Sequence, residues 1–428
     1  MTQQALGNRA RCSTLIGQQP SRPWLQSPLR VADGRRGYPL GGAVGTLRSS
    51  EYRRLSALYP ELRANEITEI KNQLRIANED LGAAIQGLED EYRQLGQTLD
   101  NWVAQRPSGG ERVDREMLRD RLKAAWRRVG GDHKHELDLS SWRPDGLPSI
   151  NVRFRHVTRL FLNRMELSAV PSLFFHRLPN SGELSLEHNR LTEIPATLGN
   201  RSKLRVLNLE GNQISANARM FEPLQNLRAL RWLNLAANQI SVLAVEAIHA
   251  LGTLDSLSTL GLRANGLTLD AGQLQALAAI PLQELDLGRN AIELDEAGAA
   301  AFAGLVRLRT LNLTDNPLGR APRLGNLRAL QHLSLRGCQI QDWPQGLSEL
   351  MQPRRHVLRT VELSRNELTE LPDLGATAFG ARAACRWPAQ PLATAQPEPA
   401  QRGCCQPLAR PWHAIQSQWQ RPGRRLVA

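Results

Sequence analysis

Lysine is nearly absent from this sequence of 428 residues. Only Lys71, Lys123, Lys134 and Lys203 occur, so arginine supplies fifty of the 54 basic side chains. A gene rich in guanine and cytosine, whose codons favour arginine, explains this bias more simply than a selected lack of acceptor amines. The shortage of lysine therefore assigns no function by itself.

Cysteine is also scarce, and its spacing excludes two classes of site. No zinc-type pairing and no even framework runs through the centre of the chain; the five cysteines are Cys12, Cys338, Cys385, Cys404 and Cys405. The adjacent Cys404 and Cys405 have no His or second pair at ligand spacing, and His133 and His135 lack further partners. We predict no metal, no cofactor and no disulfide framework, and we expect a reducing compartment.

Long apolar runs are missing as well. No segment has the roughly 18 consecutive apolar residues that a membrane-spanning helix needs. The start of the chain, MTQQALGNRARCSTLIGQQP, lacks the apolar centre of a general secretory signal. We therefore predict no membrane span.

Acidic residues are nearly absent from both ends of the chain. Residues 1–50 hold seven arginines against Asp33, and residues 375–428 hold seven against Glu398, so the ends supply twelve of the thirteen net positive charges. A nucleic-acid surface needs its basic excess on a folded face, and we therefore predict no nucleic-acid partner. Neither end shows apolar periodicity. We interpret 1–50 as a disordered basic leader, and 375–428 as a tail that is disordered or translated in a shifted frame.

Helical sequence patterns begin near residue 51. EYRRLSALY predicts a helix that ends at Pro60, whose ring opposes continuation, and another helix is expected after Asn65. Apolar residues then recur at steps of four and three, the seam of a long helix that packs on a partner helix: Leu81, Ile85, Leu88, Tyr92, Leu95, Leu99 and Trp102. A second stripe, in DREMLRDRLKAAWRRVGG, contains Met117, Leu118, Leu122, Trp126 and Val129. We interpret residues 51–130 as an α-helical hairpin cap within a monomer; self-association through the Leu81–Trp102 helix is the alternative.

The centre, residues 131–374, repeats the unit L-x-x-L-x-L-x-x-N-x-L about ten times. The Asn position is held by Asn189, Asn212, Asn238, Asn265, Asn290, Asn316 and Asn366, and in variant units by Trp142, Met165 and Cys338. Consecutive positions lie 22 to 28 residues apart, which is typical of leucine-rich repeats. The predicted fold class is therefore α/β: a leucine-rich-repeat solenoid with a parallel β-sheet on its concave face and an amino-terminal α-helical hairpin cap.

The unit has a simple physical logic. The two leucines of L-x-L face the core while the residue between them faces out, and the key Asn turns inward to satisfy backbone groups of the turn. Cys338, at this position, is predicted to be a buried and inert thiol. Between strands, LTEIPATLGN and IQDWPQGLSEL predict short extended connections, whereas SVLAVEAIHALG and LDEAGAAAFAGL predict helices on the convex side.

Outward residues of the strands define the predicted partner-binding surface. Trp and Arg are enriched at protein–protein hot spots, and Trp232 beside Arg263 offers an aromatic ring and a planar donor on neighbouring strands. The outward positions themselves carry Phe161, Ser185, Asn208, Asn234, Gly261, Asp286, Asn312, Ser334 and Glu362. The predicted binding residues are Trp232, Arg263, Asp286, Arg289, Asn312, Asp315, His332, Arg336 and Arg365.

The stretch from about Arg54 to Leu374 resembles the central part of large bacterial effector proteins, found in pseudomonads and their relatives, that end in a NEL-type ubiquitin ligase domain. The matching features are RLSALYPEL, TLDNWV, LKAAWRR, LDLSSWRPDGLPSI and HVTRLFLNRMELSAVP, and the helical lead-in joined to LDLSSW is the more specific part. The resemblance implies delivery into the host cytoplasm by a route other than general secretion, with the solenoid choosing the host protein to be ubiquitinated. Otherwise the expected location is the bacterial cytoplasm.

The chemistry of that ligase domain is not expected in this chain. A NEL domain holds its nucleophilic cysteine in a C-x-D setting, and none of the five cysteines here has Asp two residues later. We therefore predict no enzyme activity and no catalytic residue, and an interaction module of a bacterial effector-like protein that binds a host protein through its concave face. Two alternatives stay open: a ubiquitin-protein transferase whose catalytic domain is truncated or out of frame, and a self-associating structural protein.

Overall fold

The computed structural model describes residues 49–372, except for 79, 107, 171 and 353–356, together with residues 29–30 and 36–37. The chain divides into two compact units. The first contains residues up to Gln97 and Lys123–Lys134, and the second contains Thr98–Leu122 and the residues from His135 onward. Each unit is described by itself.

The leader contains two short strands. The two-residue strands β1 (Leu29–Arg30) and β2 (Arg36–Gly37) pair antiparallel, which differs from the disorder predicted for these positions. The remainder of the predicted leader lies outside the described residues, and so does the predicted tail 375–428.

Helices build the first unit, as the sequence predicts. They are α4 (Ser50–Leu58), α5 (Ala64–Ala77) and parts of α6 (Leu81–Ala104) and α7 (Gly110–Trp126), with the short turn η1 (Gly131–His133). The Ser49 hydroxyl accepts a hydrogen bond from the Tyr52 amide at 3.3 Å and so caps α4. The Trp126 indole stacks on Tyr59 and Tyr92, with ring centroids 5.6 Å and 5.1 Å apart. This aromatic stack supplies the centre of the unit's core.

The predicted seam of α6 is buried in part. Ile85, Leu95, Leu99 and Trp102 are buried, whereas Leu81, Leu88 and Tyr92 are half-buried. Packing within the monomer therefore stays a prediction, with self-association as its alternative. One member of the second stripe was assigned wrongly: Met117 is 45% exposed, whereas Arg115 is almost fully buried. Spacing along the sequence favours burial of Met117 because it cannot reveal the two backbone carbonyls that accept hydrogen bonds from the Arg115 guanidinium.

Arg115 belongs to the part of α6 and α7 that covers the first repeat. Its guanidinium donates to the Trp102 carbonyl at 2.7 Å and to the Pro144 carbonyl at 3.0 Å, and it stacks on the Trp102 ring. Nearby, the Arg143 amide donates to the Asp114 carboxylate at 2.9 Å. Residues 98–122 therefore cap the amino-terminal end of the solenoid, which would otherwise expose its first core layer.

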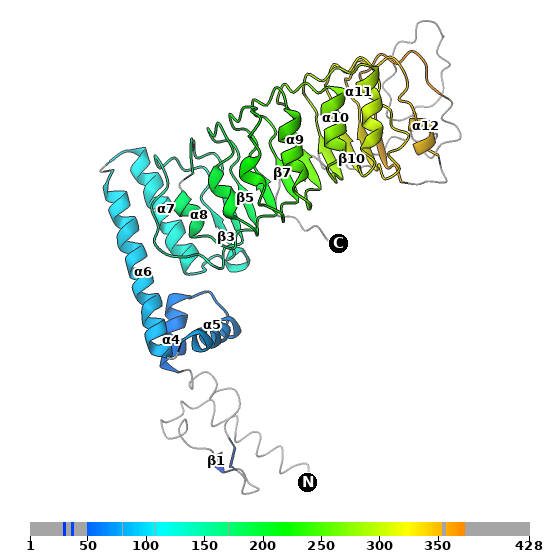
Figure 1. The fold of residues 1–428 in the computed structure, drawn as a ribbon. Helices are drawn as coiled ribbons and strands as arrows, with labels where there is room; N and C mark the ends of the chain where they lie inside the picture. The colour runs from blue at the N-terminus through cyan, green and yellow to red at the C-terminus, as the bar shows by residue number, and fades with distance from the viewer. Residues whose placement is uncertain are drawn as a thin grey trace, which may run out of the picture. The chain divides into compact units, whose positions relative to one another are not determined.

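Ten parallel strands form the sheet of the second unit, in strict chain order from β3 to β12 (Figure 1). Their bounds are β3 (Glu136–Asp138), β4 (Arg159–Phe161), β5 (Glu183–Ser185), β6 (Val206–Asn208), β7 (Trp232–Asn234), β8 (Thr259–Gly261), β9 (Glu284–Asp286), β10 (Thr310–Asn312), β11 (His332–Ser334) and β12 (Thr360–Glu362). The central residue of each strand, leucine in β3 to β11 and Val361 in β12, is paired with that of the next, as in Leu233 with Leu260. This arrangement confirms the predicted leucine-rich-repeat solenoid.

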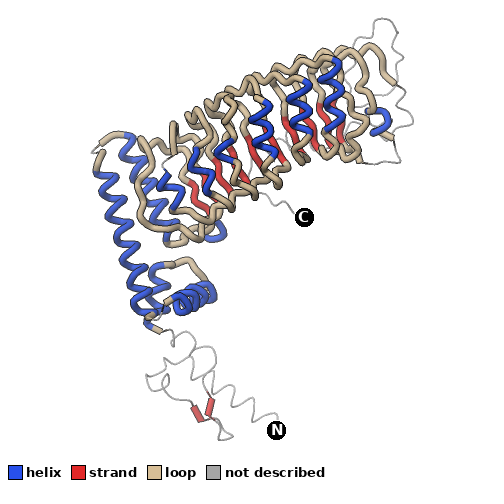
Figure 2. Tube along the Cα trace, viewed as in Figure 1, coloured by secondary structure: helices blue, strands red, loops and turns tan. Residues whose placement is uncertain are grey.

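Helices and turns cover one face of the sheet, opposite the concave face (Figure 2). They are α8 (Ser172–His176), η2 (Ala196–Asn200), η3 (Glu222–Leu224), α9 (Val245–Gly252), α10 (Ala271–Ala278), α11 (Glu296–Ala301), η4 (Phe302–Gly304) and α12 (Leu347–Leu350). The helices predicted in SVLAVEAIHALG and LDEAGAAAFAGL are confirmed as α9 and α11. The prediction of extended connections in LTEIPATLGN and IQDWPQGLSEL is wrong in part, because these segments contain the helical turns η2 and α12. The sequence analysis missed α10, although Asp270 and Gln273 form a capping box at its start.

The key asparagines join each repeat to the one before it. The Asn238 side-chain oxygen accepts a hydrogen bond from the Ile214 amide at 3.0 Å, and its Nδ2 donates to the carbonyls of Leu209 and Leu235 at 3.0 Å and 2.9 Å. Asn189, Asn212, Asn265, Asn290, Asn316 and Asn366 make corresponding contacts. One side chain thus satisfies backbone groups of two repeats at once.

We expect Asn238→Ala to lower the free energy of unfolding by about 1–3 kcal/mol, because it leaves the Ile214 amide and buried carbonyls without partners. Urea unfolding followed by circular dichroism measures this change. Gln239→Ala is the matched control, since residue 239 is adjacent and exposed, and its effect should stay within about 0.5 kcal/mol. Equal losses in both variants would contradict the role assigned to the asparagine.

Candidate protein-binding face

The strands present their side chains to the concave face in columns that run across the repeats. The first-position column holds the first residue of each strand, and the third-position column holds the third. A further column, the left-handed column, holds the residue just before each key position. Its members have positive φ angles and are Ser141, Arg164, His188, Gly211, Ala237, Ala264, Arg289, Asp315, Gly337 and Arg365. Because L-residues rarely adopt this backbone, the sharp turn of each repeat fixes where these side chains emerge.

From β5 to β11 the third-position column is buried, contrary to the expectation that it forms the accessible surface, whereas Phe161 of β4 and Glu362 of β12 are half-buried. Asn208, Asn234, Asp286 and Asn312 are each at most 5% exposed. Each side chain accepts a hydrogen bond from the amide two residues later, as Asp286 does from Gly288 at 3.0 Å. Asn312 also donates to Asp286 Oδ1 at 2.8 Å. Asp286 and Asn312, both predicted to bind a partner, are therefore buried beneath the exposed side chains and are not part of the accessible surface.

Arg263 occupies the centre of the face, above Gly288. A Cβ atom on residue 288 would lie 2.7 Å from Arg263 Nη1 and 3.1 Å from Asn312 Nδ2, so this site accepts only glycine without rearrangement. Arg263 Nη1 is buried and has no hydrogen-bond partner among the described residues. Burial lowers the pKa of Arg263, although the neighbouring Asp286 carboxylate opposes this shift. The guanidinium thus retains an unused donor.

Arg289 and Asp315 stand beside this centre as neighbours in the left-handed column. Their side chains are 62% and 43% exposed, and Arg289 Nε lies 3.5 Å from Asp315 Oδ2. An exposed pair of this kind contributes little to stability, so both groups are free to exchange partners. The structure therefore brings five of the predicted residues together as the central cluster: Arg263, Asp286, Arg289, Asn312 and Asp315.

Trp232 does not belong to this cluster. It is the first residue of β7 and pairs in register with Thr259 of β8, whereas Arg263 lies four residues beyond Thr259. At about 3.3 Å per residue, roughly 13 Å along the strand direction separates the two side chains. The expectation that Trp232 lies beside Arg263 is therefore wrong, because neighbouring strands do not place residues at different register positions together.

The remaining predicted residues gather near the last strands. His332 Nδ1 lies 2.8 Å from Thr360 Oγ1, and burial lowers the pKa of His332, with Arg359 adding to the effect. Arg336 Nη1 lies 3.8 Å from the Glu362 carboxylate. Arg365 is exposed in the left-handed column. These residues form a second, more peripheral polar group.

Sequence reasoning missed a set of half-buried carboxylates on the same face. Burial raises the pKa of Glu183, Glu187 and Glu284, and the Glu210 carboxylate raises that of Glu187 further. Glu183 Oε1 is buried without a hydrogen-bond partner in the described part of the chain. The signal was available, since Glu183 and Glu284 occupy first positions of strands and Glu187 and Glu210 follow two residues after third positions.

The remaining candidate sites are Cys338 and the two histidines His133 and His135. Cys338 is fully buried, and burial raises the pKa of its thiol to about 12, which confirms the structural role predicted for it. His133 and His135 are exposed, as expected. Among the described residues, no group of three or more His, Cys, Asp or Glu side chains is placed to hold a metal ion, and no helix is long and apolar enough to cross a membrane.

Comparison with known proteins agrees with this description of the repeats. The leucine rich repeat family matches residues 155–214. Human Podocan-like protein 1 is 34% identical over 242 residues, which make up 55% of this chain and 43% of that protein, so the match spans less than half of the relative. The chain therefore carries leucine-rich repeats.

Solved structures with a similar fold include two that are 24% identical in sequence to this chain. A leucine-rich-repeat protein of Leptospira interrogans matches with a TM-score of 0.41, covering 59% of this chain and 70% of that one. The mouse RP105/MD-1 complex matches with a TM-score of 0.44, covering 54% of this chain and 38% of that one.

We expect Asp286→Asn to stabilise the protein at neutral pH by about 1 kcal/mol, the size of a typical single substitution. The amide keeps the oxygen that accepts from Gly288 and Asn312, and it removes a buried charge. Burial raises the pKa of Asp286 above 3.8, so wild-type Asp286 destabilises the folded state above its folded pKa and stops doing so once protonated. The gain should therefore be present at pH 7.5 and fade toward pH 4.

Urea unfolding at the two pH values measures this difference. Asn312→Asp is the matched control, because it adds a carboxylate beside Asp286 and should destabilise the protein at pH 7.5 more than at pH 4. A gain for Asp286→Asn that is the same at both pH values would contradict the burial argument.

Proposed function

We propose that this chain is a protein-interaction module that recognises a partner protein through the concave face, at the central cluster. The observation that carries the proposal is Arg263, a half-buried residue whose Nη1 is buried without a hydrogen-bond partner among the described residues, in the field of the Asp286, Asp315 and Glu210 carboxylates. A partner carbonyl or carboxylate placed above Gly288 would complete that hydrogen bonding. An arginine in such a desolvated setting has the character of an interface hot spot.

The exposed groups beside Arg263 suit recognition better than stabilisation. Arg289 and Asp315 form a weak surface pair and can turn to oppositely charged groups of a partner at little cost. The buried Asp286 and Asn312 hold each other by a hydrogen bond and keep the base of the site rigid. A fixed base with adjustable charges above it reduces the ordering cost of binding.

We further propose that the module belongs to a bacterial effector-like protein that binds a host protein. The support is the resemblance to NEL-type effectors in the helical lead-in and LDLSSW, together with the way residues 98–122 cap the first repeat at Trp142 and Pro144. Delivery into the host cytoplasm by a route other than general secretion is part of this proposal. A translocation reporter fused to the chain and assayed in infected cells tests it.

Photo-cross-linking tests the binding face. A photoreactive residue replaces Ala237, which is exposed in the left-handed column, or Glu246, which is exposed on α9. In host-cell extract, we expect a discrete adduct from position 237 and none of the same mass from position 246. Arg263→Gln with Arg289→Gln should lower its yield more than tenfold, since hot-spot truncations cost about 2 kcal/mol or more. An equal adduct from position 246 would overturn the assignment to the concave face.

We expect Cys338 to form no thioester with ubiquitin. Its thiol is buried and donates to the Leu313 carbonyl at 3.1 Å, and with a pKa of about 12 it supplies almost no thiolate at neutral pH. The assay incubates the protein with a charged ubiquitin-conjugating enzyme and examines a non-reducing gel for a reductant-sensitive adduct. An adduct abolished by Cys338→Ser would show that this view of the thiol is wrong.

A further inference from the structure

Arginines line the edge of the sheet where the strands begin. The residue just before each strand forms a strand-start column, joined across repeats by backbone hydrogen bonds such as Arg231 N to Arg205 O at 2.8 Å and Arg359 N to Gln331 O at 2.7 Å. From β6 to β12 this column contains no acidic residue. We name its four arginines, all exposed, the arginine edge: Arg205, Arg231, Arg309 and Arg359.

Some exposed arginines of the solenoid are held in ion pairs, whereas others, among them Arg228 and Arg328, are not. Arg190 pairs with Glu166, and Arg320 and Arg323 both pair with Glu296. No member of the arginine edge has an ion pair within 4 Å or a side-chain hydrogen bond among the described residues. Successive members of the edge lie one, three and two strand spacings apart, about 5–14 Å, and Arg309 also attracts the Glu284 carboxylate. The edge therefore presents spaced positive charges that an external anion can approach.

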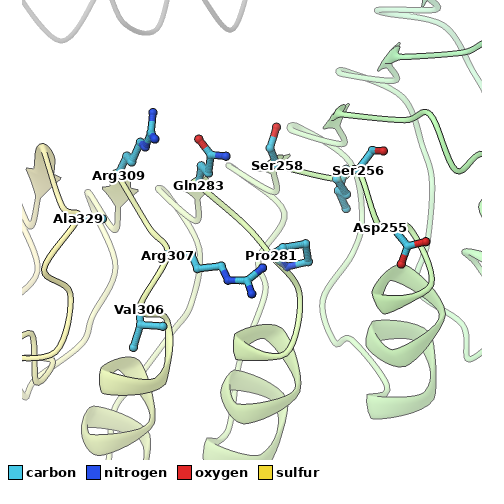
Figure 3. A pocket seen from close by; sticks show the side chains of 10 residues that line it. Asp255, Ser256, Ser258, Pro281, Gln283, Val306, Arg307, Arg309 and Ala329 are labelled. Atoms are coloured by element: carbon cyan, nitrogen blue, oxygen red, sulfur yellow. The ribbon is translucent and has the colours of Figure 1, made fainter.

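A depression of about 420 Å³ opens within this edge (Figure 3). It is bounded by the segments that lead into β8, β9 and β10. Arg307 and Arg309 supply positive charge and the Gln283 amide adds a neutral hydrogen-bond donor, while the Ser258 hydroxyl donates to the Arg231 carbonyl at 3.1 Å. In Figure 3, Ser258, Gln283 and Arg309 stand side by side and project the same way from the strand starts. Asp255 closes one end of the depression, so a single anionic group fits better than several.

We propose that the arginine edge binds an extended acidic segment of a partner protein, with one carboxylate seated in the depression between Ser258 and Arg309. Six strand spacings of about 4.8 Å separate Arg205 from Arg359, roughly 29 Å in all. An extended segment of about nine residues covers that length, and its alternate side chains project toward the edge. This surface is separate from the central cluster and does not rest on the function proposed for it.

The arrangement favours a protein segment over a nucleic acid. Ser258, Gln283 and Gln331 interrupt the charges along the row, whereas a phosphate backbone presents its charges without a gap. Single-stranded nucleic acid also needs successive aromatic rings for base stacking. From β5 to β9 the adjacent first-position column offers one such ring, the Trp232 indole, and two carboxylates, Glu183 and Glu284, each two strands away from it. Those carboxylates would repel a continuous polyanion.

Fluorescence anisotropy with a labelled twelve-residue peptide of alternating Glu and Ser tests the proposal on the full chain. We expect Arg205, Arg231, Arg309 and Arg359 changed together to Gln to weaken binding at least tenfold. The matched control changes Arg190, Arg219, Arg320 and Arg323 to Gln, an equal loss of exposed charge at paired arginines, and should keep wild-type affinity. Equal weakening in both variants, or none in the first, would overturn the proposal.

A photoreactive group at the centre of the peptide locates the contact. Cross-links to residues 255–258, 281–283 or 306–309 support the proposal, and cross-links confined to the terminal arginines or to the central cluster overturn it. A single-stranded oligonucleotide of twelve bases is the competing probe. If it bound more tightly than the peptide and lost that binding in the edge variant, the partner would be a nucleic acid and not an acidic protein segment. Arg263→Gln should leave peptide binding unchanged, which separates this test from that of the concave face.

Discussion

The asparagine ladder is the interaction on which the rest of the solenoid depends. Each key asparagine donates to carbonyls of its own repeat and of the one before, and most accept an amide from that earlier repeat. No repeat can satisfy its turn alone. Cys338 interrupts the ladder, because its sulfur donates to Leu313 but offers no oxygen to the preceding turn. There the Leu318 amide donates instead to the Asn316 carbonyl at 2.9 Å, within its own repeat.

The turn that brings the asparagine inward also shapes the binding face. To reverse direction at that point, the residue before it adopts a left-handed backbone, which costs an L-residue about 1–2 kcal/mol. Gly211 and Gly337 avoid that cost, whereas Arg289, Asp315 and Arg365 bear it. The ladder thus stabilises strained positions whose charged side chains emerge onto the concave face.

The sequence predicted the features that follow from the spacing of residues along the chain, and it missed those that depend on contacts between residues far apart in the chain. Leucine and asparagine spacing was enough for the repeat, the parallel sheet and the burial of Cys338. The burial of Asp286 could not be predicted, because it arises from an adjacent strand about 4.8 Å away and from a turn closed by its own side chain. The same applies to Arg115, whose carbonyl partner Pro144 lies 29 residues further along the chain. The separation of Trp232 from Arg263 could have been predicted, because the register of the repeats places Trp232 opposite Thr259 and not opposite Arg263.

The near-neutral charge of the central region conceals an uneven distribution of charge within it. On the concave face, carboxylates whose pKa burial raises, such as Glu183, Glu187 and Asp286, lie among arginines such as Arg263 and Arg289. From β6 to β12, the edge where the strands begin carries arginines and no acidic residue. Both patterns repeat because each repeat places the same backbone position in the same column. A solenoid can therefore hold surfaces of different character a few residues apart along each strand, and a net charge cannot reveal either. The character of each surface is therefore set column by column, with the ladder keeping the columns in register.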